Sequence, residues 1–181
     1  MILLTLGVIL WAVAHYFKRL APNARAAMGN RGKGLVAVAL VISLLMMIFG
    51  YRGAEFIHVW SPPSWTVHLN NLMMLIAVFL YGMSATTGRL RGKMRHPQLT
   101  AVKVWAVAHL LVNGDLASII LFGGMLVWAV GSVILINRSE VWVRPAPGEA
   151  KKDILLVVIT LVTFGLMTAI HAWLGVWPFP G

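Results

Sequence analysis

The chain has 181 residues, of which 60% are hydrophobic and only 11% are charged, and its mean hydropathy is +0.85. Soluble domains carry about 25% charged residues, so this composition excludes a soluble globular protein. Cysteine is absent, which excludes disulfides, iron–sulfur clusters, thiolate haem ligation and cysteine nucleophiles. The length and even composition predict a single domain over residues 1–181.

The apolar runs, taken in chain order, predict six membrane-spanning helices. Four runs each suit one span: 2–17, 35–51, 69–85 and 154–176. The run 99–136 is about twice as long as the roughly 20 residues that cross a bilayer, and Asn113-Gly114-Asp115 marks a turn inside it, so it counts as two spans. We therefore expect an all-α fold, a polytopic membrane helix bundle. The first run is not read as a signal peptide, because its positive charge follows it.

The basic residues predict how these spans are oriented. Fourteen of the fifteen Lys and Arg residues lie in three alternate segments, 18–34, 86–103 and 137–153. The positive-inside rule assigns such segments to the cytoplasm, which predicts a multi-pass protein of the bacterial inner (cytoplasmic) membrane with both termini periplasmic. Because orientation accounts for the net charge of +10, no nucleic-acid partner is expected. The expected partners are membrane lipid and a lipid-soluble small molecule.

Two features of the fifth span concern packing and capping. Ala117, Gly124 and Gly131 recur every seven residues, which predicts a face that packs closely against another helix. Asp115 precedes the span, and a carboxylate there is costly unless it is solvated or paired. We expect it to cap the turn; the alternative is that it pairs with His68 or His171.

The histidines are the candidate site residues, because polar groups inside a membrane are costly and usually functional. His15 lies about 6 Å from the cytoplasmic end of the first span. His109 lies about 13 Å into the fourth span if that span begins near Thr100, so one cofactor can touch both. The other histidines are predicted to lie in the outer half or in loops: His58, His68, His96 and His171.

Two imidazoles on different helices suit a haem better than a bare metal ion. Zinc normally takes three or four protein ligands, whereas a porphyrin supplies four nitrogens and its iron needs only one or two axial histidines. Small neighbours (Gly7, Ala12 and Ala106) are expected to leave room for a flat ring, and the propionates to pair with cytoplasmic Arg and Lys. The alternative is that each histidine hydrogen-bonds a neighbouring helix as a structural contact.

The segment from Met94 to Asp115 resembles the signature of the NnrU family of bacterial membrane proteins. The residues that carry the resemblance are Arg95-His96-Pro97, Trp105, Ala108-His109 and Asn113-Gly114-Asp115. The family is similar to the plant enzyme 15-cis-zeta-carotene isomerase, an integral membrane protein that binds haem b through histidines and isomerises a polyene double bond. The resemblance implies that His15 and His109 are the metal ligands of a haem b. With Ala106 in the turn before His109 and no cysteine, a thiol ligand switch is excluded.

The resemblance implies one of two functions: a redox-dependent isomerase of a lipid-soluble polyene, or an accessory factor in nitric oxide and denitrification metabolism. One alternative is a non-enzymatic membrane assembly or sensor protein. Another is a membrane methyltransferase related to isoprenylcysteine carboxyl methyltransferase, which Arg95-His96-Pro97 also resembles, although Asn137–Glu140 matches it poorly. No residue is assigned a catalytic role. Of the two ligands, we expect His15 to leave more readily, because its helix end is nearer water.

Overall fold

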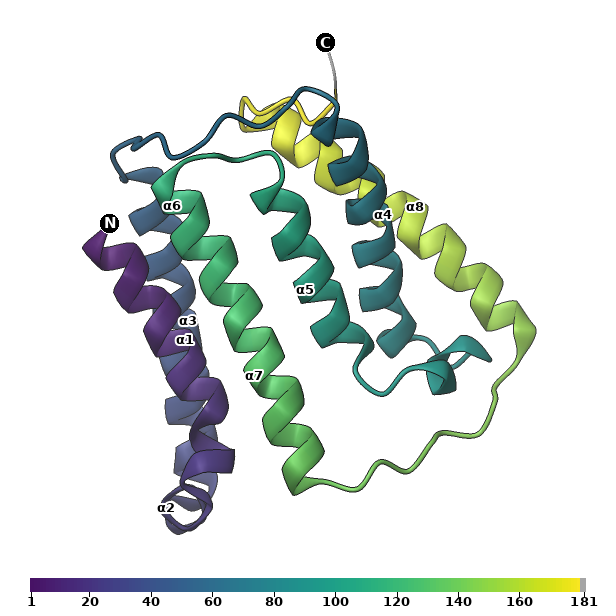
Figure 1. Cartoon of the computed structure of the whole chain (residues 1–181). Coiled ribbons are helices and arrows are strands. Elements are labelled where there is room, and N and C mark those ends of the chain that lie inside the picture. Colours follow the sequence, from purple (N-terminus) through teal and green to yellow (C-terminus); the bar gives the residue numbers. More distant parts are fainter. Residues whose placement is uncertain (180–181) are drawn as a thin grey trace. The chain divides into compact units, whose positions relative to one another are not determined.

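The computed structural model describes residues 1–179, and each predicted span is helical (Figure 1). The helices in chain order are α1 (Ile2–Leu20), α2 (Pro22–Ala27), α3 (Gly29–Arg52), α4 (Thr66–Ala85), η1 (Leu90–Lys93), α5 (Pro97–Leu110), α6 (Leu116–Ser118), η2 (Ile119–Gly123), α7 (Gly124–Ser139) and α8 (Ala150–Trp173). The segments α6, η2 and α7 follow one another without a break, and η2 is π-helical. The predicted all-α membrane helix bundle is confirmed.

The six predicted spans differ in length. Within residues 1–179, five helical stretches are long and apolar enough to cross a membrane, including 116–139 as one stretch. The fourth predicted span is α5, which has only 14 residues and therefore measures about 21 Å. A bilayer core is about 30 Å thick, so α5 alone is shorter than a typical crossing.

The helices form two compact units, each assembled from two separate stretches of the chain. Unit 1 contains Met1–Ser61 and Asn113–Glu140, and unit 2 contains Pro62–Val112 and the chain from Val141 onward. Unit 1 therefore holds α1, α2, α3, α6, η2 and α7, whereas unit 2 holds α4, η1, α5 and α8.

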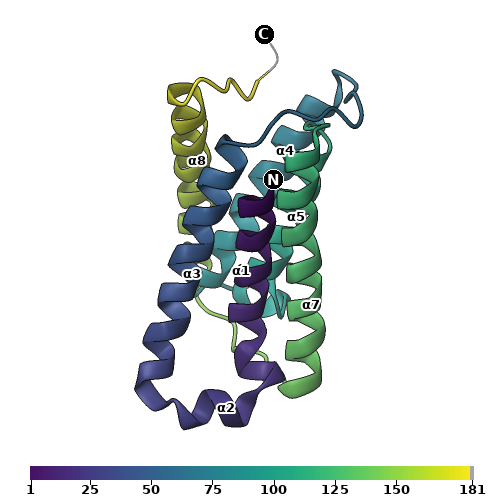
Figure 2. The same ribbon diagram turned by 90° about the vertical axis from the view of Figure 1, so that its left-hand side faces the viewer.

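Helices α1 and α3 of unit 1 pack closely through two glycines. A Cβ on Gly50 would lie 2.5 Å from the backbone nitrogen of Leu4, and one on Gly7 would lie 2.9 Å from that of Met47. Only residues without a side chain permit this approach, which membrane helices use to gain contact area. The short α2 joins the two helices (Figure 2) and begins at Pro22, where proline is well tolerated.

Helix α7 packs on α1 with the face that the sequence predicts. A Cβ on Gly124 would lie 2.5 Å from Cγ1 of Val8, and one on Gly131 would collide with the hydroxyl of Tyr16. Ala117, one step earlier in the same repeat, is buried. The predicted packing face is confirmed.

The turn before α6 is hydrogen-bonded to the segment that follows α3. The backbone nitrogens of Val59 and Trp60 donate to the carbonyl of Gly114 at 2.8 and 3.0 Å. The Asp115 carboxylate accepts from the backbone nitrogen of Ser118 at 2.9 Å and from its hydroxyl at 2.5 Å. Asp115 thus caps α6, as predicted.

Replacing Asp115 by alanine should lower the free energy of unfolding by about 1 kcal/mol, because the N-terminus of α6 loses its side-chain cap. Asp115→Asn retains an acceptor oxygen and should cost much less. Thermal unfolding of the two variants in detergent measures the difference. Equal losses in both would mean that the charge of Asp115, rather than its cap, stabilises the protein.

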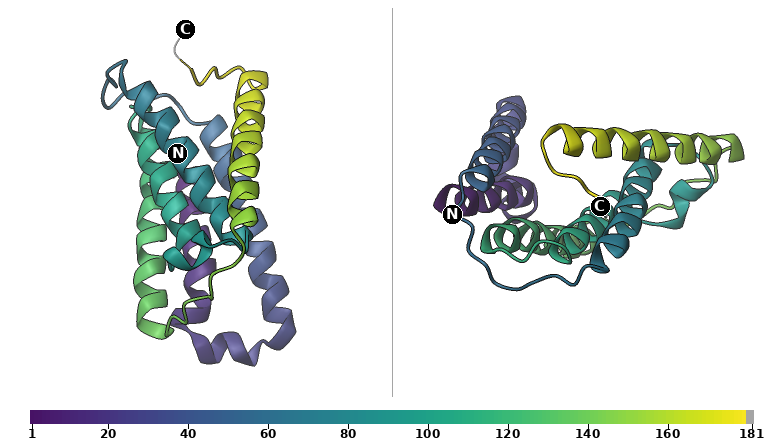
Figure 3. Two further views of the ribbon diagram at one scale, coloured as in Figure 1. Left: turned by 90° about the vertical axis from the view of Figure 1, so that its right-hand side faces the viewer. Right: turned by 90° about the horizontal axis from the view of Figure 1, so that it is seen from above.

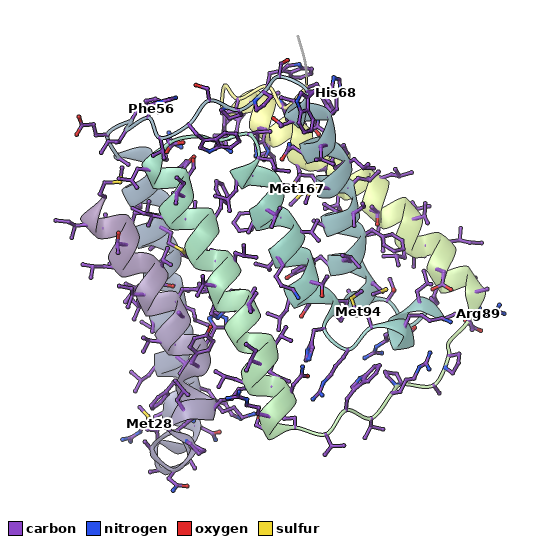
Figure 4. All side chains as sticks on the ribbon, viewed as in Figure 1. Met28, Phe56, His68, Arg89, Met94 and Met167 are labelled. Atoms are coloured by element: carbon purple, nitrogen blue, oxygen red, sulfur yellow. The ribbon has the colours of Figure 1, made fainter. Side chains whose placement is uncertain are left out.

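In unit 2, α4 packs against both α5 and α8 (Figure 3). Gly82 of α4 faces Leu156 of α8, which is fully buried. The Asp153 carboxylate accepts from the backbone nitrogens of Arg89 and Leu90 at 3.1 and 3.2 Å, and this joins the start of α8 to the segment after α4 (Arg89 is labelled in Figure 4).

Candidate functional histidines

His15 lies on α1 between two tryptophan rings of unit 1. The imidazole is half-buried, with its centroid 4.4 Å from that of Trp11 and 4.7 Å from that of Trp128 on α7. Its Nδ1 lies 2.9 Å from the carbonyl oxygen of Trp11. A carbonyl only accepts, so Nδ1 carries the hydrogen, and the neutral ring keeps its lone pair on Nε2. This is the tautomer that metal-ligating histidines adopt when a carbonyl orients them.

The packing of α7 on α1 is what brings Trp128 to His15. Trp128 is only 7% exposed, and the Tyr16 hydroxyl donates to its carbonyl at 2.8 Å. The indole nitrogens of Trp11 and Trp128 are buried and have no hydrogen-bond partner among the described residues. Buried donors are normally paired, so these two N–H groups are free to take an acceptor that a ligand brings.

His109 lies on α5 of unit 2 in the same local arrangement. Its Nδ1 is 2.9 Å from the carbonyl oxygen of Trp105, and the two ring centroids are 5.3 Å apart. The imidazole is half-buried. Nδ1 therefore donates, and the lone pair of the neutral ring is on Nε2.

The two histidines lie in identical local sequences. Residues 11–15 and 105–109 are the same pentapeptide, Trp-Ala-Val-Ala-His. Both copies are helical, and in each the tryptophan supplies both the carbonyl and the neighbouring ring. The sequence-based reasoning found the two histidines but not this repeat, which a comparison of the chain with itself reveals.

The family model described as NnrU protein matches residues 3–178. The chain belongs to the NnrU family. No curated protein and no solved structure matches the chain. The matched range includes both pentapeptides and all six histidines, so every candidate residue of this NnrU protein lies within the part of the chain that matches the family model.

The helix bounds change the predicted depths of the two histidines. Helix α5 begins at Pro97 rather than near Thr100, which sets His109 about 18 Å from the helix start. His15 lies five residues before the end of α1, about 8 Å. His109 is also the penultimate residue of α5, so the reason for expecting His15 to leave more readily does not hold.

The small residues expected beside a ring have other roles. Gly7 serves the approach of α1 to α3, and Ala106 is fully buried. These two positions therefore do not provide the space that the sequence suggests. Ala12 is half-buried.

The remaining histidines occupy four different settings. His171 is exposed on α8, with Nδ1 2.7 Å from the carbonyl of Met167. His58 Nε2 lies 3.0 Å from the Ser61 hydroxyl. His96 precedes α5 as its N-cap residue, and His68 is exposed near the start of α4 (Figure 4).

Two further observations concern the expected metal site and the methyltransferase alternative. Within residues 1–179, no three His, Asp or Glu side chains form a group that could hold a metal ion. Glu140, at the end of the segment that matches the methyltransferases poorly, forms an ion pair with Arg19, with 3.1 Å between the nitrogen and the oxygen.

Proposed function

We propose that this NnrU protein binds one b-type haem in the membrane, with His15 and His109 as the axial ligands of the iron. The observation that carries the proposal is the repeated pentapeptide, in which a tryptophan carbonyl accepts from Nδ1, so that the lone pair that can bind a metal is on Nε2. A haem needs only one or two such nitrogens from the protein. Two matching imidazoles on two apolar helices meet that need.

The surroundings of His15 support the same proposal. The unpaired indole N–H groups of Trp11 and Trp128 provide donors for a polar group of a bound cofactor, and their rings provide apolar contact. When bound, haem would supply an iron that can change oxidation state and exchange a ligand. The protein's part is to orient the two imidazoles through their Nδ1–H bonds and to exclude water with the tryptophan rings.

The absorption spectrum of the protein purified in detergent, oxidised and then reduced, tests the proposal. We expect a Soret band and the split visible bands of a low-spin haem with two histidine ligands. The haem should be extractable into acidified organic solvent, because no cysteine attaches it covalently. Protein that shows no Soret band after expression with ample haem supply would refute the proposal.

We infer that the haem serves a redox-dependent isomerisation of a lipid-soluble polyene. The support is the similarity of the NnrU family to a polyene isomerase and the burial of His15 among apolar rings. Incubating the reduced protein with a cis-polyene in detergent and separating the isomers measures this activity. A haem protein that leaves the polyene unchanged would be assigned instead to an accessory role in nitric oxide metabolism.

We also propose an inner-membrane location with both termini periplasmic, which requires α5 to count as a crossing. The alternating basic segments support this orientation, and a thinned bilayer or the flanking residues can make up for the length of α5. A reporter fused to the C-terminus should therefore behave as periplasmic. A cytoplasmic C-terminus would mean that α5 enters the membrane without crossing it.

A further inference from the structure

The connection between α1 and α3 carries positive charge that the protein does not neutralise. Residues 18–34 contain five Lys and Arg residues and no Asp or Glu: Lys18, Arg19, Arg25, Arg31 and Lys33. Arg19 forms the ion pair with Glu140. The side chains of Lys18, Arg31 and Lys33 form no hydrogen bond or ion pair with any described residue. The connection therefore attracts anions.

Arg25 of α2 is held in place against the start of α3. Its Nη1 donates to the carbonyl oxygen of Gly29 at 3.1 Å. Gly29 has a φ of 51°, which residues with a side chain rarely adopt. A Cβ added to Gly32 would lie 2.7 Å from the same Nη1. The guanidinium group thus lies where the absence of a side chain at Gly32 leaves room for it.

Most of the hydrogen-bond donors of Arg25 are unused. A guanidinium group has five N–H donors, and the bond to Gly29 is the only one that Arg25 makes with the described side chains and carbonyls through its own side chain. The side chain is half-buried rather than enclosed. Phosphate groups accept paired N–H bonds from arginine. Because the Gly29 carbonyl already orients the guanidinium, little further side-chain freedom is lost when an anion binds.

The position of this connection favours a lipid phosphate as the anion. Helices α1 and α3 are both long and apolar enough to cross a membrane, and α2 lies across their ends (Figure 2). Leu20, at the end of α1, is 66% exposed, and Leu35, where the apolar run of α3 begins, is 57% exposed. Arg25 therefore lies between the ends of two apolar helices, at the level where the lipid headgroups begin.

We propose that Arg25 binds the phosphate of an anionic phospholipid, such as phosphatidylglycerol, at the connection between α1 and α3. Basic residues next to a membrane span attract anionic lipids, and Lys18, Arg31 and Lys33 supply that attraction here. This inference goes beyond the proposed function and does not rest on haem binding. The alternative is a diffuse attraction to which every surface cation contributes equally. Only a defined site depends on how Arg25 is held.

Native mass spectrometry of the full-length protein, released from detergent, tests the proposal. The protein is titrated with phosphatidylglycerol or with phosphatidylcholine, whose ammonium group neutralises the phosphate. The test variants are Arg25→Gln, Arg25→Lys and Gly32→Ala. The matched controls are Arg138→Gln, which removes an exposed cation from the last turn of α7 in the same unit, and Gly34→Ala, whose added Cβ would meet nothing within 4 Å.

We expect Arg25→Gln to weaken binding of the first phosphatidylglycerol about tenfold, because charge-assisted hydrogen bonds are lost. Arg25→Lys should recover only part of this affinity, because an ammonium group cannot make the paired contact. Gly32→Ala should weaken binding without changing the charge, whereas Arg138→Gln and Gly34→Ala should match the wild type. Equal losses in Arg25→Gln and Arg138→Gln would indicate diffuse attraction and overturn the inference.

Two further outcomes keep the inference falsifiable if Gly32→Ala fails to fold, since its Cβ would also lie 2.7 Å from the Cβ of Met28. The wild type should bind phosphatidylglycerol more tightly than phosphatidylcholine, and equal affinity for the two lipids would overturn the inference. A short RNA that displaces the bound lipid at an equal concentration of phosphate would assign the surface to a nucleic acid and would overturn it as well.

Discussion

Replacing His15 and His109 together by alanine should remove the Soret band of the purified protein, whereas each single replacement should leave a haem with one axial histidine. The two imidazoles are presented by identical pentapeptides with the same Nδ1–carbonyl bond, so each is expected to bind the iron, with or without the other. Losing one opens a coordination position, and the single variants should therefore bind carbon monoxide more readily than the wild type. Spectra recorded with and without carbon monoxide measure this.

Two further histidine variants serve as controls for this experiment. His58→Ala removes an imidazole that bonds to Ser61 outside the helices and should leave the spectrum unchanged. His171→Ala is combined with His109→Ala, because His171 is a second helical histidine of the same unit and a candidate to replace His109. A Soret band that survives in the His15→Ala, His109→Ala double variant would mean that other histidines ligate the iron.

The helices could be predicted from the sequence because the apolar runs are long and the charges fall between them. The helix ends were predicted less accurately. Helices α1 and α3 extend through basic residues that the sequence assigns to a loop. Lys and Arg are good helix formers, so charge alone does not end a helix. The π-helical η2 has no signal in its composition, since Ile119–Gly123 is as apolar as its neighbours.

The candidate site was predicted in part. His15 and His109 could be selected as candidates because polar groups in a membrane are costly. Asp115 could be predicted as a cap because the turn requires polar residues. The position of Trp128 beside His15 depends on how α7 packs on α1, which spacing within one helix does not reveal.

The close approach of α1 and α3 should make Gly50 intolerant of any side chain. Its added Cβ would lie 2.5 Å from the nitrogen, 2.8 Å from the Cα and 3.0 Å from the Cβ of Leu4. Leu4 is fully buried, and two of these three atoms belong to a helix backbone. Neither side can yield by a rotamer change alone, so the two helices must move apart.

Gly50→Ala should therefore lower the free energy of unfolding by about 1–3 kcal/mol, the usual cost of overpacking, and Gly50→Val by more. Membrane helices have little hydrophobic drive toward one another, so lost van der Waals contact is not recovered elsewhere. Thermal unfolding in detergent measures the loss, as a lower midpoint for both variants.

Gly34→Ala provides the matched control for this prediction, because Gly34 is on the same helix and an added Cβ would meet nothing within 4 Å. Alanine is the better helix former by about 1 kcal/mol, so this variant should be as stable as the wild type or slightly more stable. Its behaviour separates a general effect of glycine in α3 from the contact with Leu4. If Gly50→Ala and Gly34→Ala unfolded at the same temperature, α1 and α3 would not pack through Gly50, and the cause of any shared change would lie in helix propensity.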